Sequence, residues 1–421
     1  MKPKYWLVLG AITAAAAQSA ACSSKFSSCT ESRTCAPKGG TGGMGEAGDT
    51  ATAEAGEPEN SETGGVGGND ESVAHEGGAG GEAGATSPQC DSDVDLDSDP
   101  KNCGRCGHDC LGGECTMGTC QPLELARNQG AVLAIALDDH FIYWGGDSSS
   151  IAKKSIDNSG TSTELVPAAA KEYAYSLVVV DQTLFWSNDW KDNAIRGCAL
   201  PSCSAGPQEL ITASTPARGL FYSEPKKTLY FTQQKAIWQK ALPGGQTVQI
   251  TPTTELAANI TSDGQYVYWS EYSPTTGTSS IRKIPVSGGK DSGLADGLSY
   301  LTKLVAYERV LYVLEDPTNG TGVQGDARIF AIPLPNGVGS GTVPEFANAG
   351  AKARQLAVDD SGVYWTETDG NLEGSIRHCP LTGCTGPADV LASAAGPEGI
   401  ATDARAVYWV STNGQVMKLA K

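Results

Sequence analysis

The sequence predicts an all-β fold, a seven-bladed β-propeller preceded by a long low-complexity segment and a small cysteine-rich module. Three observations carry this prediction. A phrase of two apolar runs joined by a short turn recurs seven times between residues 133 and 409. The copies repeat at intervals of 38 to 52 residues, close to the period of about 40–50 residues of propeller blades. The first run is apolar at consecutive positions, as in 177–180, which suits a strand packed on both faces between neighbouring blades.

Each copy ends on a marker residue, usually a tryptophan. The copies are LAIALDDHFIYW (133–144), SLVVVDQTLFW (176–186), GLFYSEPKKTLYF (219–231), NITSDGQYVYW (259–269), KLVAYERVLYV (303–313), QLAVDDSGVYW (355–365) and GIATDARAVYW (399–409). Because copies three and five lack the tryptophan, a six-bladed ring is the alternative to seven blades.

Each unit contains more than a hairpin. A third run follows each copy: SIAKKSI (150–156), AIRGCAL (194–200), AIWQKAL (236–242), SIRKIPV (280–286), RIFAIPL (328–334), SIRHCPL (375–381) and QVMKLAK (415–421). A weaker fourth run follows a turn in TELV (163–166), QELI (208–211) and TVQI (247–250). Four antiparallel strands make one blade. The turn between the first two strands usually opens with an aspartate, whose carboxylate can accept backbone N–H bonds; these are Asp138, Asp181, Asp263, Asp359 and Asp403.

The last unit stops after its third run, at Lys421. Just before the first unit lies PLELA (122–126), which has no hairpin partner of its own. We expect this segment to supply the outer strand of the last blade. The two ends of the propeller segment would then pair, which removes the open sheet edges.

The aromatic pairs resemble those of the exported YWTD/NHL-type propellers and of the related six-bladed TolB-like group. Residues 364–367, YWTE, come nearest to the YWTD motif, and the other copies read YWGG, FWSN, YFTQ, YWSE, YVLE and YWVS. The resemblance covers 122–421 and implies a propeller, but propellers serve binding, scaffolding and catalysis alike. We expect the Tyr-Trp pairs to be core residues between blades rather than ligand contacts.

Residues 1–21 predict a secretory signal peptide, with a basic start, an apolar stretch over 5–17 and small residues before Cys22. Cys22 after Ser-Ala-Ala resembles the lipobox of bacterial lipoproteins, which implies cleavage before Cys22 and a lipid on its sulfur. Ser19 stands where that box usually has leucine, so ordinary signal cleavage near Ala21 is the alternative. Since no later stretch reaches the ~18 apolar residues of a spanning helix, we expect a lipid anchor to be the only membrane attachment.

Residues 22–89 predict a disordered tether. From residue 37 onward the segment is mostly Gly, Ala, Glu, Ser and Thr, which bury too little apolar surface to offset the cost of ordering. The chain has a net charge of −18, and 18 acidic against 5 basic residues lie between 23 and 121. This acidic arm should stay solvated, and it speaks against nucleic acid and anionic lipid as partners.

Residues 90–121 predict a disulfide-stapled module, because so short a segment has little core. The chain has 13 cysteines, so setting aside Cys22 leaves an even number that can all pair. The module's own six cysteines allow 15 connectivities. Two further pairs, Cys198 with Cys203 and Cys379 with Cys384, are predicted to pin the outer edges of blades two and six. The full candidate set is Cys29, Cys35, Cys90, Cys103, Cys106, Cys110, Cys115, Cys120, Cys198, Cys203, Cys379 and Cys384.

Two metal alternatives exist in this module, and we expect neither a metal site nor a cofactor. Zinc could use Cys103, Cys106, His108 and Cys110, but the spacing fits no zinc pattern and an oxidising compartment favours disulfides. The aspartates at alternate positions over 91–99 suggest calcium. That run lacks the glycine at position six and the glutamate at position twelve of an EF-hand loop.

Propeller ligands usually lie at the mouth of the central channel, where first strands begin. By alignment of the copies, the candidate ligand-binding residues are Tyr175, Arg218, Asn259, Lys303, Arg354 and Glu398. This mixture could bind a polar or anionic ligand, or could form a solvated channel lining. No catalytic residue is assigned, because none of the four histidines, His75, His108, His140 and His378, falls on a channel-facing strand.

The sequence therefore leaves two functions open. We expect a monomeric, surface-tethered, non-enzymatic lipoprotein at the outer membrane or cell surface, whose propeller binds or scaffolds an unidentified protein or glycan. Without lipidation the protein would be periplasmic or extracellular. The alternative is a lactonase, hydrolase or lyase that works at the channel mouth, which would require a role for Glu398 or Arg354.

Overall fold

The computed structural model describes Cys90 and residues 93–421, with gaps at 148, 189–192, 212–216, 234, 319–324, 339–341 and 370–371. Cys90–Lys421 belong to one compact unit. The signal peptide, Cys22, Cys29, Cys35, His75 and the tether lie outside the described residues, so the predictions about them stay predictions. Among the described residues, no helix is both long enough and apolar enough to cross a membrane.

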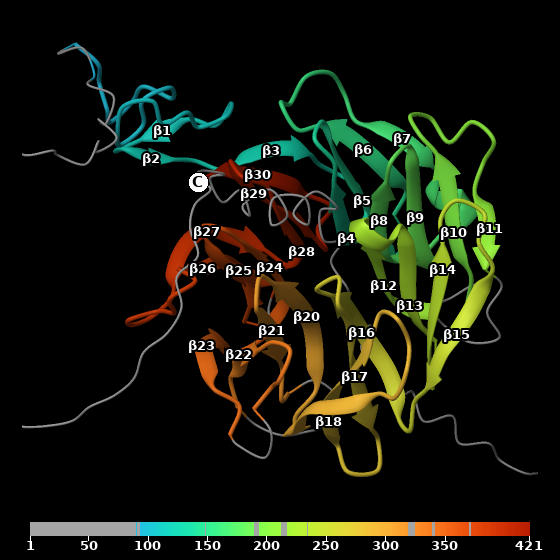
Figure 1. The fold of residues 1–421 in the computed structure, drawn as a ribbon. Coiled ribbons are helices and arrows are strands. Elements are labelled where there is room, and N and C mark those ends of the chain that lie inside the picture. The colour runs from blue at the N-terminus through green and yellow to red at the C-terminus, as the bar shows by residue number, and fades with distance from the viewer. Residues whose placement is uncertain are drawn as a thin grey trace, which may run out of the picture. The chain divides into compact units, whose positions relative to one another are not determined.

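Seven four-stranded antiparallel sheets follow one another along the chain and form a ring (Figure 1). Blades 1 and 2 contain β4 (Ala131–Leu137), β5 (Phe141–Asp147), β6 (Ile151–Ser155), β7 (Thr163–Val166), β8 (Ala174–Val180), β9 (Thr183–Asn188), β10 (Ile195–Ala199) and β11 (Gln208–Ile211). Blades 3 and 4 contain β12 (Ala217–Ser223), β13 (Thr228–Gln233), β14 (Ala236–Ala241), β15 (Thr247–Pro252), β16 (Leu256–Ser262), β17 (Tyr266–Ser273), β18 (Thr278–Pro285) and β19 (Ser292–Leu298).

Blades 5 to 7 complete the ring. They contain β20 (Leu301–Tyr307), β21 (Val310–Glu315), β22 (Ala327–Pro333), β23 (Glu345–Gly350), β24 (Ala353–Asp359), β25 (Gly362–Thr368), β26 (Glu373–Cys379), β27 (Asp389–Ala395), β28 (Pro397–Thr402), β29 (Ala406–Ser411) and β30 (Val416–Ala420). Short 3₁₀ turns lie at Ala168–Ala170 and Glu224–Lys226. The seven sheets confirm the seven-bladed prediction and exclude the six-bladed alternative.

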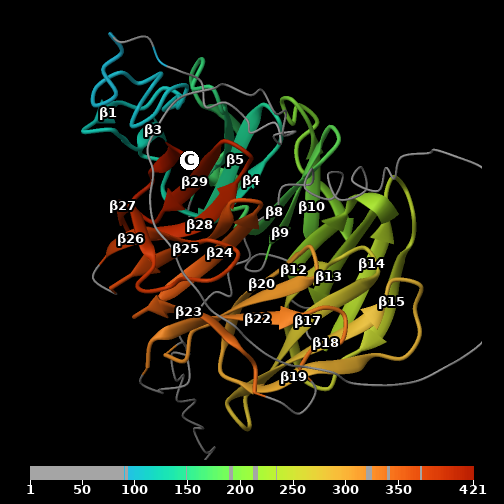
Figure 2. The same ribbon diagram turned by 60° about the vertical axis from the view of Figure 1, so that its left-hand side comes forward.

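The fourth strand of blade 7 comes from the other end of the propeller segment. Strand β3 (Leu123–Ala126) pairs with β30, with Leu123 opposite Lys418 and Glu124 opposite Met417. Leu125 is buried against the core between blades 7 and 1. The first strands contact one another in succession, and β28 contacts β4, so the ring is closed (Figure 2).

Apolar side chains fill the space between adjacent blades. The largest fully buried side chains include Trp144, Trp186, Trp269, Trp365 and Trp409. An apolar cluster joins every pair of neighbouring blades, so each first strand has apolar neighbours on both faces. This arrangement explains why runs such as 177–180 do not alternate between polar and apolar residues.

Four of the five predicted aspartates, those of blades 1, 4, 6 and 7, accept backbone N–H bonds in the first turns; within the described ranges Asp181 of blade 2 does not. In blade 4, Asp263 Oδ1 accepts from the backbone N–H groups of Gln265 and Tyr266, at 2.9 and 2.7 Å. The Tyr268 hydroxyl donates to the other carboxylate oxygen at 2.7 Å. Asp138 with Tyr143 and Asp403 with Tyr408 repeat this geometry in blades 1 and 7. In these three blades the aspartate therefore joins its turn to the tyrosine of the Tyr-Trp pair.

The cysteine-rich module contains a two-stranded sheet of β1 (Cys115–Thr116) and β2 (Thr119–Cys120). Its disulfides join Cys90 to Cys106, Cys103 to Cys115 and Cys110 to Cys120. This is one of the 15 connectivities that the sequence allows. The cysteines of the zinc alternative are therefore in disulfides. The hairpin disulfides Cys198–Cys203 and Cys379–Cys384 are also present, in blades 2 and 6.

The module packs on the last blades. Buried Cys103, Cys110 and Cys120 share a cluster with side chains of blades 6 and 7, including Val407 and Leu419. His108 Nε2 lies 2.7 Å from the Lys421 carbonyl oxygen, and Nδ1 lies 2.6 Å from the Cys103 carbonyl oxygen. Both views place β1 and β3 beside the carboxy-terminal end (Figures 1 and 2). We call the joint between the module, blade 7 and blade 1 the seam.

Candidate functional site

Every first strand carries a β-bulge close to its start. The register with the second strand shifts there in all seven blades. Bulges re-aim side chains and are common beside functional sites. The two residues of each bulge are Leu133 and Ala134, Tyr175 and Ser176, Arg218 and Gly219, Ala258 and Asn259, Thr302 and Lys303, Arg354 and Gln355, and Glu398 and Gly399.

All six ligand-binding candidates lie in these bulges, but they do not share one position. The reference point in each blade is the first-strand residue that pairs with the marker residue of the second strand. Two residues before this point lie Tyr175, Arg218, Arg354 and Glu398, and one residue before it lie Asn259 and Lys303. The candidates thus form two neighbouring sets of positions.

Several candidates contact the protein itself. Arg354 Nε lies 3.9 Å from Glu398 Oε1, which pairs blade 6 with blade 7. The Asn259 side-chain amide donates to the Leu301 carbonyl oxygen at 3.0 Å, which joins blade 4 to blade 5. Lys303 is buried, with 4% of its surface exposed. The hydrogen bond of Asn259 fits a structural lining, and the Arg354–Glu398 contact is an ion pair beyond hydrogen-bond distance.

A hydroxyl that follows the marker residue links neighbouring bulges. Thr366 Oγ1 accepts from the Gln355 backbone N–H at 3.1 Å and donates to the Glu398 carbonyl oxygen, in the next blade, at 2.8 Å. Thr232 repeats both bonds between blades 3 and 4. The Ser or Thr after the aromatic pair therefore has a structural role in joining blades.

Glutamate–arginine pairs, in each of which the glutamate is the more buried partner, lie near the same end of four blades. The sequence analysis did not identify them, although a glutamate two residues after the marker and an arginine in the third run were visible in three blades. The closest contacts are Glu172–Arg196 at 2.8 Å, Glu271–Arg282 at 3.9 Å, Glu315–Arg328 at 2.6 Å and Glu367–Arg377 at 2.7 Å. Trp186 and Trp269 also donate to the glutamates, at 3.2 and 2.8 Å. In blades 4, 5 and 6 these pairs join the second strand to the third, and in blade 2 the pair joins the segment before β8 to β10.

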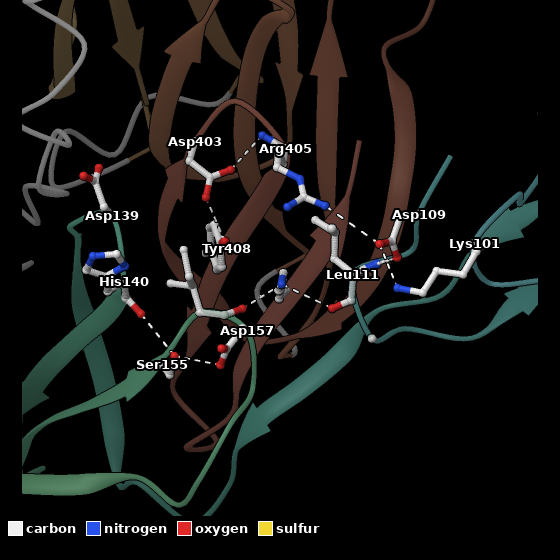
Figure 3. Close-up of a pocket in the computed structure, with 13 residues that line it drawn as sticks. Lys101, Asp109, Leu111, Asp139, His140, Ser155, Asp157, Asp403, Arg405 and Tyr408 are labelled. Atoms are coloured by element: carbon white, nitrogen blue, oxygen red, sulfur yellow. Dashed lines mark hydrogen bonds and ion pairs between the residues drawn. The ribbon is translucent and has the colours of Figure 1, made fainter. Parts of the chain in front are cut away.

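A cleft of about 520 Å³ lies at the seam, at the end of the blades opposite the bulges. Its volume falls within the range of about 300–1,000 Å³ of small-ligand sites. We call it the seam cleft (Figure 3). Its lining comes from the module, blade 1 and blade 7: Lys101, Asp109, Leu111, Gly112, Asp139, His140, Ser155, Ile156, Asp157, Asp403, Arg405, Tyr408 and Lys418.

Lys418 forms the floor of the seam cleft. It lies on β30 and only 5% of its surface is exposed. Its ammonium group donates to the Ile156 carbonyl oxygen at 2.7 Å and to the Leu111 carbonyl oxygen at 3.2 Å. Burial lowers the pKa of Lys418 from its usual 10.5, and the nearby Asp403 carboxylate opposes this shift. One side chain of blade 7 therefore joins the module to blade 1.

One wall of the cleft carries two cations around a single carboxylate. Asp109 of the module lies 2.8 Å from the Lys101 ammonium group and 3.9 Å from the Arg405 guanidinium. The Lys101 hydrogen bond holds the pKa of Asp109 below its usual 3.8, although burial opposes this shift. Arg405 lies in the turn between β28 and β29 and is exposed, so its guanidinium borders the open part of the cleft (Figure 3).

The facing wall belongs to blade 1 and is acidic. Asp139 and His140 lie in the turn between β4 and β5, and Asp157 follows β6. Hydrogen bonds from Ser159 and Ser155 lower the pKa of Asp157 to about 2, so its carboxylate stays ionised at neutral pH. Toward the module and blade 7 the lining carries three cations and the carboxylates of Asp109 and Asp403, whereas toward blade 1 its charged groups are carboxylates.

The residues of the calcium alternative have other contacts. Asp95 accepts from the Ser98 hydroxyl at 2.5 Å and from the Asp97 backbone N–H at 2.9 Å. Asp99 accepts from the Asn102 amide at 2.8 Å and from the Lys101 backbone N–H. Asp91 lies outside the described residues. These local bonds are those of turns, in which an aspartate satisfies backbone donors two residues on.

No family model matches the chain, and no curated protein matches it. Solved structures do. Hydrazine synthase from Kuenenia stuttgartiensis has a TM-score of 0.54 at 12% identity, over 70% of this chain and 97% of that chain. The WD40 repeats of RRP9 have a TM-score of 0.52 at 12% identity, over 71% and 97%. Virginiamycin B lyase from Staphylococcus aureus has a TM-score of 0.51 at 15% identity, over 72% and 98%.

At such low identity these similarities show the fold alone. The chain is a seven-bladed β-propeller whose structural neighbours include WD40 repeats and other propellers.

Proposed function

We propose that this protein is a lipoprotein of the bacterial envelope whose propeller is a non-enzymatic binding module. Cys22 carries the lipid anchor, and the acidic segment that follows holds the propeller away from the membrane surface. The seam cleft is the binding site. The observation that supports this choice is a concave, charged surface built from three separate parts of the chain around the buried Lys418.

The anchor is tested on the full chain. We expect the wild-type protein to fractionate with membranes and to carry a lipid mass on the peptide that begins at Cys22. Cys22→Ala should move the protein to the soluble fraction without changing its unfolding temperature. An unmodified amino terminus that begins elsewhere would contradict the lipid anchor and leave the propeller's role to be tested separately.

Binding at the seam cleft is tested by capture from an envelope extract with wild-type protein and Arg405→Glu. Arg309→Glu is the matched control, because Arg309 is an exposed arginine in the corresponding turn of blade 5. We expect Arg405→Glu to lose an envelope component that the wild type and Arg309→Glu both retain. Identical captures by both variants would contradict the site. Turnover of a lactone or ester panel that Glu398→Ala abolishes would instead support a channel-mouth enzyme.

A further inference from the structure

We infer that the seam cleft binds a zwitterionic ligand the size of a short peptide. Its carboxylate would lie against Lys418 and Arg405, and its ammonium group against Asp139 and Asp157. This inference rests on the proposed function, since it names the chemistry of the ligand for the same site.

The floor offers a donor for a carboxylate. An ammonium group has three N–H donors. Lys418 uses two of them on the Ile156 and Leu111 carbonyl oxygens, and its third meets no acceptor in the part of the chain that the structure describes. This donor borders the cleft, so a ligand carboxylate could accept its third N–H. Such a bond would be strong, because charge-assisted hydrogen bonds are roughly twice as strong as neutral ones.

The wall of the module and blade 7 offers a second cation. The Arg405 guanidinium lies 3.9 Å from Asp109, which is beyond hydrogen-bond distance. Asp109 is already bound by Lys101 at 2.8 Å. A guanidinium has a planar fork of donors that matches a carboxylate. Arg405 and Lys418 can therefore share one ligand carboxylate at this side of the cleft.

The wall of blade 1 excludes a simple anion. Asp139 and Asp157 both line the cleft, and hydrogen bonds from the neighbouring serines keep Asp157 ionised. A ligand with negative charge alone would be repelled by these carboxylates, and a ligand with positive charge alone would leave the third N–H of Lys418 without an acceptor. A molecule with one charge of each sign, set apart by a short chain, meets an opposite charge at both ends.

The test uses tri-alanine, which has both terminal charges and no charged side chain. Its N-acetyl form lacks the ammonium group and its C-terminal amide lacks the carboxylate. Titration into full-length protein, followed by calorimetry and by NMR shifts of the peptide methyl groups, should show binding of tri-alanine. Each blocked form should bind roughly tenfold or more weakly, since each loses a charge-assisted contact.

Two variants test which wall of the cleft binds each end of the peptide. Arg405→Gln should weaken tri-alanine binding but leave the binding of its amide unchanged. Asp139→Asn should weaken tri-alanine binding but leave the binding of the N-acetyl form unchanged. Both residues are exposed, so the fold should persist; Arg309→Gln is the control. Equal binding of all three peptides, or no binding of tri-alanine, would overturn the inference. If capture from the envelope extract still depends on Arg405, the binding module stands and only the ligand class is wrong.

Discussion

Single side chains join neighbouring blades at fixed places in the repeat. Thr366 is one of them, because its hydroxyl bonds the bulge of blade 6 and the bulge of blade 7. Thr366→Val keeps the shape of the side chain but leaves the Gln355 N–H and the Glu398 carbonyl without this partner. We expect a loss of about 1–3 kcal/mol in the free energy of unfolding, measured by chemical denaturation. Thr275→Val, at an exposed turn, should change it by no more than about 0.5 kcal/mol.

A buried ion pair joins blade 6 to the end of the chain. The Lys421 ammonium group contacts the Asp359 carboxylate and the Asp403 carbonyl oxygen. Burial alone would raise the pKa of Asp359, but the Lys421 charge and hydrogen bonds from Lys421, Ser361 and Thr402 hold it below its usual 3.8. Burial lowers the pKa of Lys421, although Asp359 opposes this shift. At neutral pH the lowered pKa of Asp359 favours folding, whereas the lowered pKa of Lys421 opposes it. The pair therefore stabilises the fold chiefly because each buried charge has a partner of opposite sign.

This pair predicts acid sensitivity. Because the folded pKa of Asp359 is depressed, its contribution to stability is complete above the usual carboxyl pKa and is lost as the pH falls through the lower, folded value. Asp359→Asn leaves Lys421 buried without its charge partner and should cost about 3–5 kcal/mol at neutral pH. The unfolding temperature should fall less between neutral pH and pH 2 in the variant than in the wild type. An unchanged unfolding temperature at neutral pH would contradict a stabilising role.

At the scale of elements, the module's docking on the propeller depends on His108. Both of its ring nitrogens face carbonyl oxygens, one in the module and one at Lys421. His108→Ala removes both contacts. We expect the free energy of opening of the module, measured by amide hydrogen exchange, to fall by about 1–2 kcal/mol. His378→Ala, at the hairpin of blade 6, is the control. Unchanged exchange in the module of His108→Ala would show that the apolar contact of the cysteines holds it alone.

The paired apolar runs made the inner elements predictable. The third run over 375–381 corresponds to β26, and the run over 194–200 to β10. The outer strands β19, β23 and β27 were harder, because they have one sheet neighbour and partly exposed side chains, so their sequences carry no regular apolar pattern. The bulges were missed for a related reason, since one extra residue alters register without changing composition.

At the scale of the whole molecule, ring closure brings together residues that no local pattern connects. The walls of the seam cleft come from 101–112, 139–157 and 403–418, so neither its charges nor the buried Lys418 could be found from spacing. Three of the Glu–Arg pairs, by contrast, join positions on adjacent strands of one blade and could have been found from the repeat alignment. Sequence therefore predicts contacts within a blade better than contacts across the seam.

The seam cleft depends on closure of the ring by β3. The most direct test is a disulfide between Glu124→Cys and Met417→Cys, because these residues are opposite each other on β3 and β30. Paired strand positions bring two cysteines within reach of a bond. Peptide mapping of the oxidised protein should find residues 124 and 417 linked in nearly all molecules, and should find no link in a control that pairs Glu124→Cys with Val248→Cys of blade 3. An unlinked 124–417 pair, or equal linkage in the control, would contradict the closed ring.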